Sequence, residues 1–383
     1  MKRIPYTHQD IDKNDIKGAV RVLQSDWLTQ GPKIAAFEEA LCRYTGARYA
    51  VAVANGTAAL HIASLAAGIV KGDEVITSPI TFVASANSIL YADGRPVFAD
   101  IQADTVNIDP DAIKKKITRK TKAVIPIHFA GHPCDLKEIS EICKKHGLLL
   151  IEDAAHALGA EYRGSKIGSC AYSDMTIFSF HPAKSITTGE GGAVLTDNKD
   201  LYDKLFILRT HGITRQHERF KFRDQQRNGS WYYEMQELGF NYRITDFQCA
   251  LGISQMKKLD KFIRRRQEIV TMYQDALSGI ASIILPIEKE YVKSSWHIYY
   301  IRLKDPLQRK SVFEKLCKMN ISANVHYIPV HLQPYYRKSF GFKEGDYPQA
   351  ENYYNGAITI PLYPSMRLAQ IRYVVKSLKR LLK

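Results

Sequence analysis

The sequence lacks a hydrophobic run long enough to cross a membrane. In its 383 residues, the longest nearly uninterrupted apolar stretch, 58–70, contains a histidine and a serine and is too short to span a bilayer. The first residues carry basic charge but have no apolar segment behind them, so we expect no signal peptide. These absences predict a protein without a membrane partner.

Paired cysteine motifs are also missing. The six cysteines form no C-x-x-C pair and no dense framework, which is typical of reduced thiols in the cytoplasm. His128 and His132 have H-x-x-x-H spacing, but Gly131 and Pro133 disfavour the helix that a metal-binding pair of this spacing needs. We therefore expect a cytoplasmic protein with no metal site, in which both histidines lie in loops.

Acidic residues are in deficit, because 39 Asp and Glu stand against 54 Lys and Arg, for a formal net charge of +15. Such a charge indicates anionic partners, of which nucleic acid is one candidate. The basic clusters are short, however, and each lies in an amphipathic stretch, at 114–116, 257–258, 264–266 and 376–383. This pattern is typical of solvated helix faces, and zinc-finger, RNA-binding and basic-zipper signatures are absent, so we expect no nucleic-acid partner.

β-rich runs alternate with helical periodicity through the first two-thirds of the chain. The expected strands lie at 49–53, 74–77, 96–101, 123–128, 148–153, 175–180 and 192–197, with helical patterns between most of them. Many of these strands are apolar on both faces. The pattern predicts an α/β fold with a mostly parallel sheet that helices cover on both sides.

The pattern changes after the last of these strands. Residues 213–238 are polar, aromatic-rich and without clear periodicity, which is typical of a functional or a disordered loop. A long helical stretch at 245–277 and a strand at 297–303 follow, and two further helices complete the chain. We expect a large domain at 1–254, including an N-terminal segment, and a smaller α+β domain at 255–383.

Three segments carry candidate chemistry, and none belongs to the common phosphate-loop, dinucleotide, hydrolase or zinc-protease motifs. The first is Asn55-Gly56-Thr57, directly after the strand at 49–53. A tight turn at a helix start offers free backbone N–H groups to a phosphate, Gly56 lets the ligand approach, and Thr57 adds a hydroxyl. On its own, the segment could equally be an ordinary turn.

The other two segments end later strands. Asp153 closes the run at 148–153, where its carboxylate could hold a protonated ring nitrogen or cap a following helix. Lys184 follows the strand at 175–180 and precedes a glycine-rich turn. Partial burial would lower the pKa of its amine and make it a nucleophile towards a carbonyl group, although most isolated lysines are simply solvated.

Together, the three segments meet the needs of pyridoxal 5′-phosphate. That cofactor requires a phosphate cradle, a carboxylate beside its pyridine nitrogen and a lysine that forms a Schiff base. Phe82 adds an aromatic ring that could stack on it. The combination is far more specific than any one of its parts.

The chain resembles the DegT/DnrJ/EryC1/StrS family of sugar-nucleotide aminotransferases over essentially its full length. The matching segments are SDWLTQGPKIAAFEEAL (25–41), ANGTAALH (54–61), SPITFVASAN (78–87), IEDAAHALGA (151–160), FSFHPAKSITTGEGG (178–192), LGFNYRITDFQCALG (238–252) and NVHYIPVHLQPYY (324–336). The resemblance implies the fold-type I architecture of aminotransferases that depend on pyridoxal 5′-phosphate. It also implies a homodimer with active sites shared between the subunits.

The resemblance also implies roles for individual residues. Lys184 is the expected Schiff-base lysine and proton shuttle, and it argues against the related dehydratase branch, which carries histidine there. The other expected cofactor contacts are Asp153 at the pyridine nitrogen, Phe82 on the ring, His156 beside the ring, Gly56, Thr57 and Ser179 at the phosphate, and Asn241, donated across the dimer to the phosphate.

Within the family, segments such as 209–215 and 231–243 resemble the branch that acts on the route to pseudaminic acid. That branch implies UDP-2-acetamido-2,6-dideoxy-β-L-arabino-hexos-4-ulose as the amino acceptor and L-glutamate as the donor. Candidate contacts to the nucleotide sugar are Trp231, Arg243, His326 and Tyr327, each of which could equally be packing within a loop. Another NDP-4-keto-6-deoxy sugar as acceptor, or a non-catalytic regulator on the same scaffold, stays open as an alternative.

Overall fold

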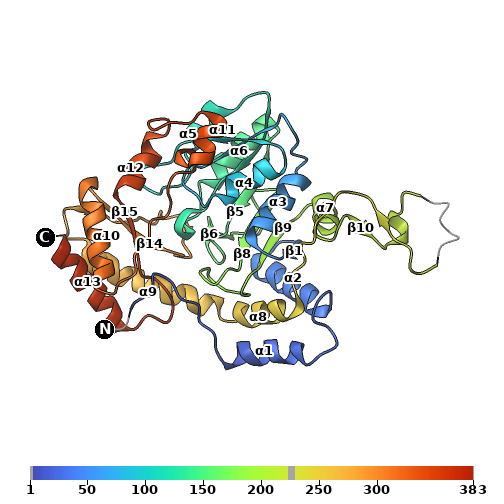
Figure 1. The fold of residues 1–383 in the computed structure, drawn as a ribbon, viewed down its shortest axis with the longest axis horizontal. Helices are drawn as coiled ribbons and strands as arrows, with labels where there is room; N and C mark the ends of the chain where they lie inside the picture. Colours follow the sequence, from blue (N-terminus) through green and yellow to red (C-terminus); the bar gives the residue numbers. More distant parts are fainter. Residues whose placement is uncertain (1–2, 223–228, 383) are drawn as a thin grey trace.

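A seven-stranded sheet forms the centre of the molecule (Figure 1). The computed structural model describes residues 3–222 and 229–382, and the strand order is β1-β9-β8-β5-β4-β2-β3. The bounds are β1 Tyr49–Val53, β2 Glu74–Thr77, β3 Arg95–Phe98, β4 Thr121–Ile125, β5 Leu149–Asp153, β8 Met175–Ser179 and β9 Gly192–Thr196. β9 is antiparallel to both of its neighbours, β1 and β8, and every other pair of neighbouring strands is parallel. The predicted mostly parallel sheet is confirmed.

Both faces of this sheet are buried, as the apolar strands predict. Val51 and Val53 of β1 pack in one hydrophobic cluster with helix α3, whereas Ala50 and Ala52 pack in another with Phe37 of helix α2. Successive side chains of a strand point to opposite faces, so the two clusters lie on the two sides of the sheet. The helices around it are α2 Pro32–Thr45, α3 Gly56–Ala66, α4 Ala84–Tyr91, α5 Pro110–Lys116, α6 Leu136–His146 and α7 Lys199–Arg209.

The C-terminal part has a small sheet of its own. The helical stretch predicted at 245–277 is two helices, α8 Asp246–Met256 and α9 Leu259–Leu277. A three-stranded antiparallel sheet follows, in the order β12-β14-β15. The bounds of its strands and of the nearby helices are β12 Ile283–Ile284, β14 Tyr299–Leu303, β15 Ala357–Ile360, α10 Arg309–Lys318, α11 Pro334–Phe340, α12 Pro348–Gly356 and α13 Leu368–Leu381. A hydrophobic cluster joins α9, α10, α13 and the three strands, and Ile4 belongs to it as well, whereas Tyr336 of α11 and Tyr353 of α12 pack in a separate cluster with Phe98 of the large sheet. The domain boundary at 254/255 stays a prediction.

An arm projects from the body beyond α7 (Figure 1). We define the arm as residues 213–222 and 229–238, because 223–228, which belong to the predicted irregular segment, lie outside the described residues. It contains two short antiparallel strands, β10 Ile213–Thr214 and β11 Glu234–Met235. The remaining elements are α1 Lys13–Leu23, β6 Glu161–Tyr162, β7 Ser165–Lys166 and β13 Val292–Lys293, together with short 3₁₀ turns. One of those turns, Phe129–Gly131, separates His128 from His132, so both lie in a loop as predicted.

Arg266 corrects the interpretation of 264–266 as a solvated helix face. Its side chain is fully buried, and its Nη1 donates hydrogen bonds to the carbonyl oxygens of Trp296, His297 and Leu362 at 3.0 to 3.3 Å. Burial lowers the pKa of this guanidinium to about 10. One arginine of this basic cluster is therefore a core residue, and its hydrogen bonds connect separate segments of the C-terminal part.

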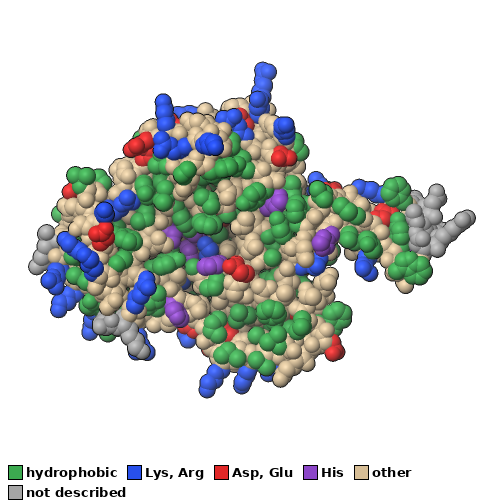
Figure 2. Space-filling view, viewed as in Figure 1, with side chains coloured by type: hydrophobic (Ala, Val, Ile, Leu, Met, Phe, Trp, Pro, Cys, Tyr) green, Lys and Arg blue, Asp and Glu red, His purple; other side chains and the backbone are tan. Residues whose placement is uncertain are grey.

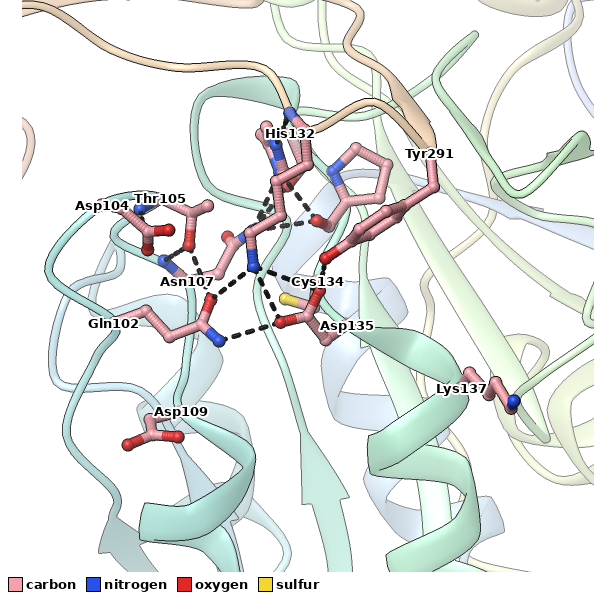
Figure 3. Close-up of polar contacts among 12 residues, drawn as sticks. Gln102, Asp104, Thr105, Asn107, Asp109, His132, Cys134, Asp135, Lys137 and Tyr291 are labelled. Atoms are coloured by element: carbon pink, nitrogen blue, oxygen red, sulfur yellow. Dashed lines mark hydrogen bonds and ion pairs between the residues drawn. The ribbon is translucent and has the colours of Figure 1, made fainter.

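A polar cluster ties the segment after β12 to the large sheet (Figure 3). The Asp135 carboxylate accepts hydrogen bonds from Gln102 Nε2 at 2.8 Å and from the Tyr291 hydroxyl at 2.7 Å, and Lys289 Nζ lies 3.0 Å from it. Figure 3 shows Gln102, Asp135 and Tyr291 converging from three separate segments. Since its polar atoms are satisfied by one another, we regard this cluster as structural.

Two kinds of feature are absent from the described part of the chain. Across residues 3–222 and 229–382, no helix is both long and apolar enough to cross a membrane. The same residues contain no group of three or more His, Cys, Asp or Glu side chains placed to hold a metal ion.

Candidate active site

The phosphate-binding segment lies where two strands end. Strands β1 and β8 both end at the same edge of the sheet, so Asn55-Gly56-Thr57 lies beside Ser179. A Cβ atom on Gly56 would stand only 2.9 Å from the Ser179 Cβ, so glycine is required for this approach. Asn55 caps α3 by accepting the Ala58 N–H at 2.8 Å, which leaves the first N–H groups of the helix free.

This cradle fits an anion. The hydroxyls of Thr57 and Ser179 make no hydrogen bond with any other described residue. Free N–H groups at a helix start carry partial positive charge, and with two hydroxyl donors they suit a phosphate group. The structure therefore brings Gly56, Thr57 and Ser179 together, as expected for the three residues.

Lys184 lies in the turn that joins β8 to β9. The turn is closed by backbone hydrogen bonds from Phe180 to Gly191 at 2.8 Å and from Thr188 to Phe180 at 3.0 Å. The lysine side chain is partly buried, and burial lowers the pKa of its amine to about 8, while the charge of Asp153 acts in the opposite direction. A substantial fraction of this amine is neutral, and hence nucleophilic, at mildly alkaline pH.

Asp153 is the last residue of β5 and is buried. Its Oδ1 accepts the Ala155 N–H at 3.1 Å, and its Oδ2 accepts the Ser85 hydroxyl at 2.6 Å. Residues 154–160 form turns, so the alternative in which Asp153 caps a following helix is wrong. The carboxylate instead lies close enough to Lys184 for its charge to raise the pKa of the lysine amine, against the effect of burial.

His156 has one ring nitrogen without a partner. Its Nε2 lies 3.1 Å from the Tyr327 hydroxyl, while the buried Nδ1 contacts no hydrogen-bonding group of the described chain. Burial, reinforced by the charge of Lys184, lowers the pKa of this histidine well below its ordinary value, so the ring is neutral. Because the phenol has no other acceptor, we assign it as the donor to Nε2, which places the hydrogen on Nδ1.

Two more histidines line the same region. The ring of His297 lies 4.2 Å from that of His156, and its own Nδ1 is also buried and unpartnered within the described residues. His326 Nδ1 lies 2.8 Å from the Thr359 hydroxyl, and burial lowers its pKa to about 4. Histidine side chains gather near the middle of one face of the molecule (Figure 2).

The aromatic rings of Phe82 and Tyr327 lie next to each other at the candidate site. Phe82 precedes α4, and its side chain is 58% exposed although it is a large apolar residue. Its ring centroid lies 6.2 Å from that of Tyr327, which contacts His156 from the other side. An exposed aromatic ring at this position can stack on a flat ligand.

The remaining predicted residues lie towards the arm. Arg243 lines a cavity of about 410 Å³ together with Gln30, Arg209, Arg215 and Arg219. Asn241 is exposed beside Thr210, and Trp231, on the arm, is 74% exposed. No contact between either of these two residues and Lys184 or Asp153 occurs within the described part of one chain.

These features fit pyridoxal 5′-phosphate. The cradle at Gly56 would hold its phosphate, Asp153 its ring nitrogen and Lys184 its aldehyde carbon. The unpartnered Nδ1 of His156 offers a buried donor with no role inside the chain. The site can therefore support attack by an amine on a carbonyl group and proton transfer next to it.

Three residues of this site were not predicted from the sequence. Ser85 and Thr81 lie within SPITFVASAN, where small polar residues at helix starts normally bond to the local backbone. His297 is a lone histidine in front of a strand, and a single histidine is no signal without a neighbour. Only the folded chain shows its contact with His156.

The chain is similar to known aminotransferases. The profile of the DegT/DnrJ/EryC1/StrS aminotransferase family matches residues 9–379. The spore coat polysaccharide biosynthesis protein SpsC of Bacillus subtilis (strain 168) is 41% identical, with 99% of this chain and 97% of SpsC covered. The UDP-4-amino-4,6-dideoxy-N-acetyl-beta-L-altrosamine transaminase of Campylobacter jejuni (serotype O:23/36, strain 81-176) is 40% identical, with 98% and 96% covered.

A solved structure is similar over the whole chain. Helicobacter pylori PseC, described as an aminotransferase involved in the biosynthesis of pseudoaminic acid, superposes with a TM-score of 0.90 at 33% identity. The superposition covers 100% of this chain and 99% of PseC.

Proposed function

This chain belongs to the DegT/DnrJ/EryC1/StrS aminotransferase family, and we propose that it transfers an amino group from L-glutamate to C4 of a UDP-linked 4-keto-6-deoxy-N-acetylhexosamine. As a member of the family it is a sugar aminotransferase of fold type I that uses pyridoxal 5′-phosphate. The acceptor that we propose is UDP-2-acetamido-2,6-dideoxy-β-L-arabino-hexos-4-ulose, and the reaction would be a step in pseudaminic acid biosynthesis. The names of the Campylobacter and Helicobacter relatives support this choice.

The observation that carries the proposal is the proximity of Lys184 to Asp153. The amine has a pKa lowered to about 8 by burial, and the charge of the carboxylate at the end of β5 acts on it in the opposite direction. A regulator on the same scaffold would need neither a nucleophilic amine nor a buried acid.

The residues that would hold the cofactor come from three strand ends and from the partner subunit. When bound, pyridoxal 5′-phosphate supplies the electron sink that makes the α-hydrogen of an amino acid acidic. We propose contacts from Gly56, Thr57 and Ser179 to the phosphate, Asp153 to the ring nitrogen, Phe82 to the ring face, His156 to the ring edge, and Asn241 across the dimer.

Lys184 would move the proton in both halves of the reaction. Its neutral Nζ can accept the hydrogen from the glutamate α-carbon and hold it as an ammonium group. The same Nζ can accept and return the proton that ends on C4 of the sugar. A pKa near the working pH serves both directions, because neither protonation state is strongly favoured.

His156 and Tyr327 would fix the geometry around that proton transfer. Because the His156 imidazole is neutral, it does not act as a charged proton donor in place of Lys184. The hydrogen bond that Tyr327 donates to its Nε2 fixes the direction of its Nδ1–H. His326, also neutral, lies near the same amine. We therefore propose that His326 and Tyr327 contact the reacting end of the sugar.

The cavity at Arg243 suits the nucleotide diphosphate. Arg209 is paired with Glu38 and Arg219 with Asp203, but the Arg243 guanidinium has no partner among the described residues. An unpaired arginine in a cavity of about 410 Å³ is available to a phosphate group. We propose that Arg243 and Trp231 bind the nucleotide end of the substrate.

A homodimer would complete these sites. Exposed apolar side chains cluster along α1 and the segment after it, at Ile16, Val20, Leu23, Trp27 and Leu28. Apolar side chains gather over the part of the surface where α1 lies (Figure 2). Such a surface favours contact with a second copy, and the arm would then lie against that copy.

The proposal is tested by assaying the purified protein with pyridoxal 5′-phosphate and L-glutamate against UDP-, dTDP- and GDP-linked 4-keto-6-deoxy sugars. We expect 2-oxoglutarate release with the UDP-linked N-acetylhexosamine and none with Lys184→Ala. Turnover with a dTDP- or GDP-linked sugar alone would instead favour another NDP-4-keto-6-deoxy sugar. Cofactor binding without turnover of any sugar would favour the regulator.

The role of Arg243 is tested in the same assay. Arg243→Gln should raise KM for the sugar nucleotide and leave KM for glutamate unchanged. Arg372→Gln, at an exposed position of α13, is the matched control and should change neither constant. An unchanged KM for the sugar nucleotide in Arg243→Gln would contradict the assignment.

A further inference from the structure

Three buried side chains form a hydrogen-bonded chain that ends on Asp153. The Ser85 hydroxyl lies 2.6 Å from Asp153 Oδ2, and the Thr81 hydroxyl lies 2.7 Å from the Ser85 hydroxyl. Thr81, Ser85 and Asp153 are 2%, 1% and 5% exposed. Water therefore has little access to any of the three.

The chemistry of these groups sets the direction of the hydrogen bonds. An ionised carboxylate only accepts, so Ser85 must donate its hydrogen to Asp153. The Ser85 oxygen can then accept the hydrogen of Thr81. The alternative acceptor for Ser85, the Phe82 carbonyl, is 3.4 Å away, which is too long for a good O–H···O bond. Both hydroxyl hydrogens therefore point towards the carboxylate, and each bond strengthens the other.

The two bonds to Asp153 hold its carboxylate in one plane. Ala155 N–H binds Oδ1 at 3.1 Å and Ser85 binds Oδ2, which leaves lone pairs on the open side of the group. A carboxylate fixed in this orientation is what a protonated ring nitrogen needs as a partner.

The two hydroxyl groups that support Asp153 belong to the same short segment as Phe82. Thr81 and Ser85 flank Phe82, whose ring is exposed for stacking. A serine in the first turn of a helix usually bonds to nearby backbone, but Ser85 bonds to a side chain 68 positions further along the sequence. One short segment therefore carries both the Phe82 ring and the serine that orients the Asp153 carboxylate.

We propose that Ser85, backed by Thr81, is a positioning residue that keeps the Asp153 carboxylate aimed at the cofactor's ring nitrogen. The inference rests on the proposed role of Asp153 in binding pyridoxal 5′-phosphate. It requires neither the proposed acceptor sugar nor the proposed amino donor.

The test compares Ser85→Ala with Ser88→Ala. Ser88 is buried on the same helix, and its hydroxyl donates to the Ser85 carbonyl at 2.9 Å without contacting Asp153. Two quantities are measured: the dissociation constant of pyridoxal 5′-phosphate from the apo-protein, and the pH midpoint of the visible absorbance of the holo-protein. Neither measurement needs a sugar.

We expect Ser85→Ala to weaken cofactor binding about tenfold, the effect of one hydrogen bond to a charged group. We also expect its absorbance midpoint to move to higher pH, because a less protonated ring withdraws fewer electrons. Thr81→Val should shift both quantities in the same direction by less, Ser85→Thr should restore them, and Ser88→Ala should leave them unchanged.

Thermal unfolding of each variant separates these effects from loss of the fold. Ser85→Ala with an intact fold, unchanged cofactor affinity and an unchanged midpoint would overturn the inference. Equal shifts in Ser88→Ala would overturn it too, because a general disturbance of the helix would then explain both. A wild-type protein that shows no cofactor absorbance would contradict both this inference and the proposed function. A protein that binds the cofactor but turns over none of the sugars would contradict the proposed function alone.

Discussion

The Tyr327 hydroxyl lies 3.1 Å from Nε2 of His156, and the two rings are only 23° from parallel. The pair joins the small C-terminal part of the chain to the loop after β5. Burial raises the pKa of the tyrosine and lowers that of the histidine, so both groups are neutral. Their hydrogen bond sets which nitrogen of His156 carries the hydrogen and how the ring is turned.

Tyr327→Phe should therefore lower kcat about fivefold to tenfold, since one net hydrogen bond is worth about 1 kcal/mol. The fold should be retained, because the phenyl ring keeps the aromatic contacts. Steady-state kinetics across pH checks this. Tyr299→Phe is the control: its buried hydroxyl has no partner in the described chain, so its loss should leave kcat unchanged. Equal effects in the two variants would contradict the role of Tyr327.

Lys184 should make the stability of the apo-protein depend on pH. Its folded pKa of about 8 lies below the ordinary value of 10.5, so between these values the unfolded chain binds more protons and stability rises with pH. Below pH 8 the buried ammonium group costs free energy. We expect apo Lys184→Met to be more stable than the apo wild type at pH 7, with the difference shrinking towards pH 10. Chemical denaturation at several pH values measures this, and a constant difference would contradict the lowered pKa.

Gly56→Ala should weaken cofactor binding. The new Cβ would stand 2.9 Å from the Ser179 Cβ, so the turn and Ser179 must separate and the phosphate loses part of its cradle. A lost hydrogen bond to a charged group corresponds to a decrease in affinity of about tenfold or more. Titration of the apo-protein with pyridoxal 5′-phosphate measures it. Gly18→Ala in α1, where the nearest atom would be 3.5 Å away, should not change the affinity.

Asp135→Asn should destabilise the fold by about 2 kcal/mol at pH 7, because Lys289 loses its partner in a partly buried cluster. Burial raises the pKa of Asp135, but hydrogen bonds from Gln102, Tyr291 and Lys289 outweigh it and bring the pKa below the ordinary 3.8. The carboxylate therefore contributes stability above pH 3.8 that is lost as the pH falls through its folded pKa.

Urea denaturation of Asp135→Asn and wild type at pH 7 and pH 3 would show this. The difference should be largest at pH 7 and smaller at pH 3, which lies below the ordinary pKa of the carboxyl group. A double variant with Lys289→Met should recover part of the loss, because no unpaired charge then remains. Equal destabilisation at both pH values would show that the charge of Asp135 is not involved.

The strands of the large sheet could be predicted from the sequence because their periodicity reflects burial on both faces. The run at 49–53 is one example, in which successive residues from Ala50 to Val53 pack alternately in two different clusters. The sequence does not indicate the break between α8 and α9 at residues 257–258, because the apolar pattern continues through it. It does not indicate the short strand β15 either, since the four residues of that strand are fixed by pairing with β14.

The sequence likewise predicts some residues of the site and not others. Asp153 ends a strand, and Gly56 and Lys184 lie a few residues after strands, so the topology of a parallel sheet predicts that they meet. His297 could not be predicted, because its contact with His156 joins residues 141 positions apart through the packing of the C-terminal part. Trp231 and Asn241 have no contact with Lys184 in the described part of one chain, so their roles rest on a second subunit and stay predictions.

Reductive labelling of Lys184 tests the central claim most directly. Borohydride reduction of the holo-protein followed by peptide mapping should place the cofactor on Lys184 with near-complete occupancy. Prior incubation with L-glutamate should abolish this label, and subsequent addition of the UDP-linked 4-keto sugar should restore it. A label on another lysine, or a label on Lys184 that glutamate does not remove, would contradict the account.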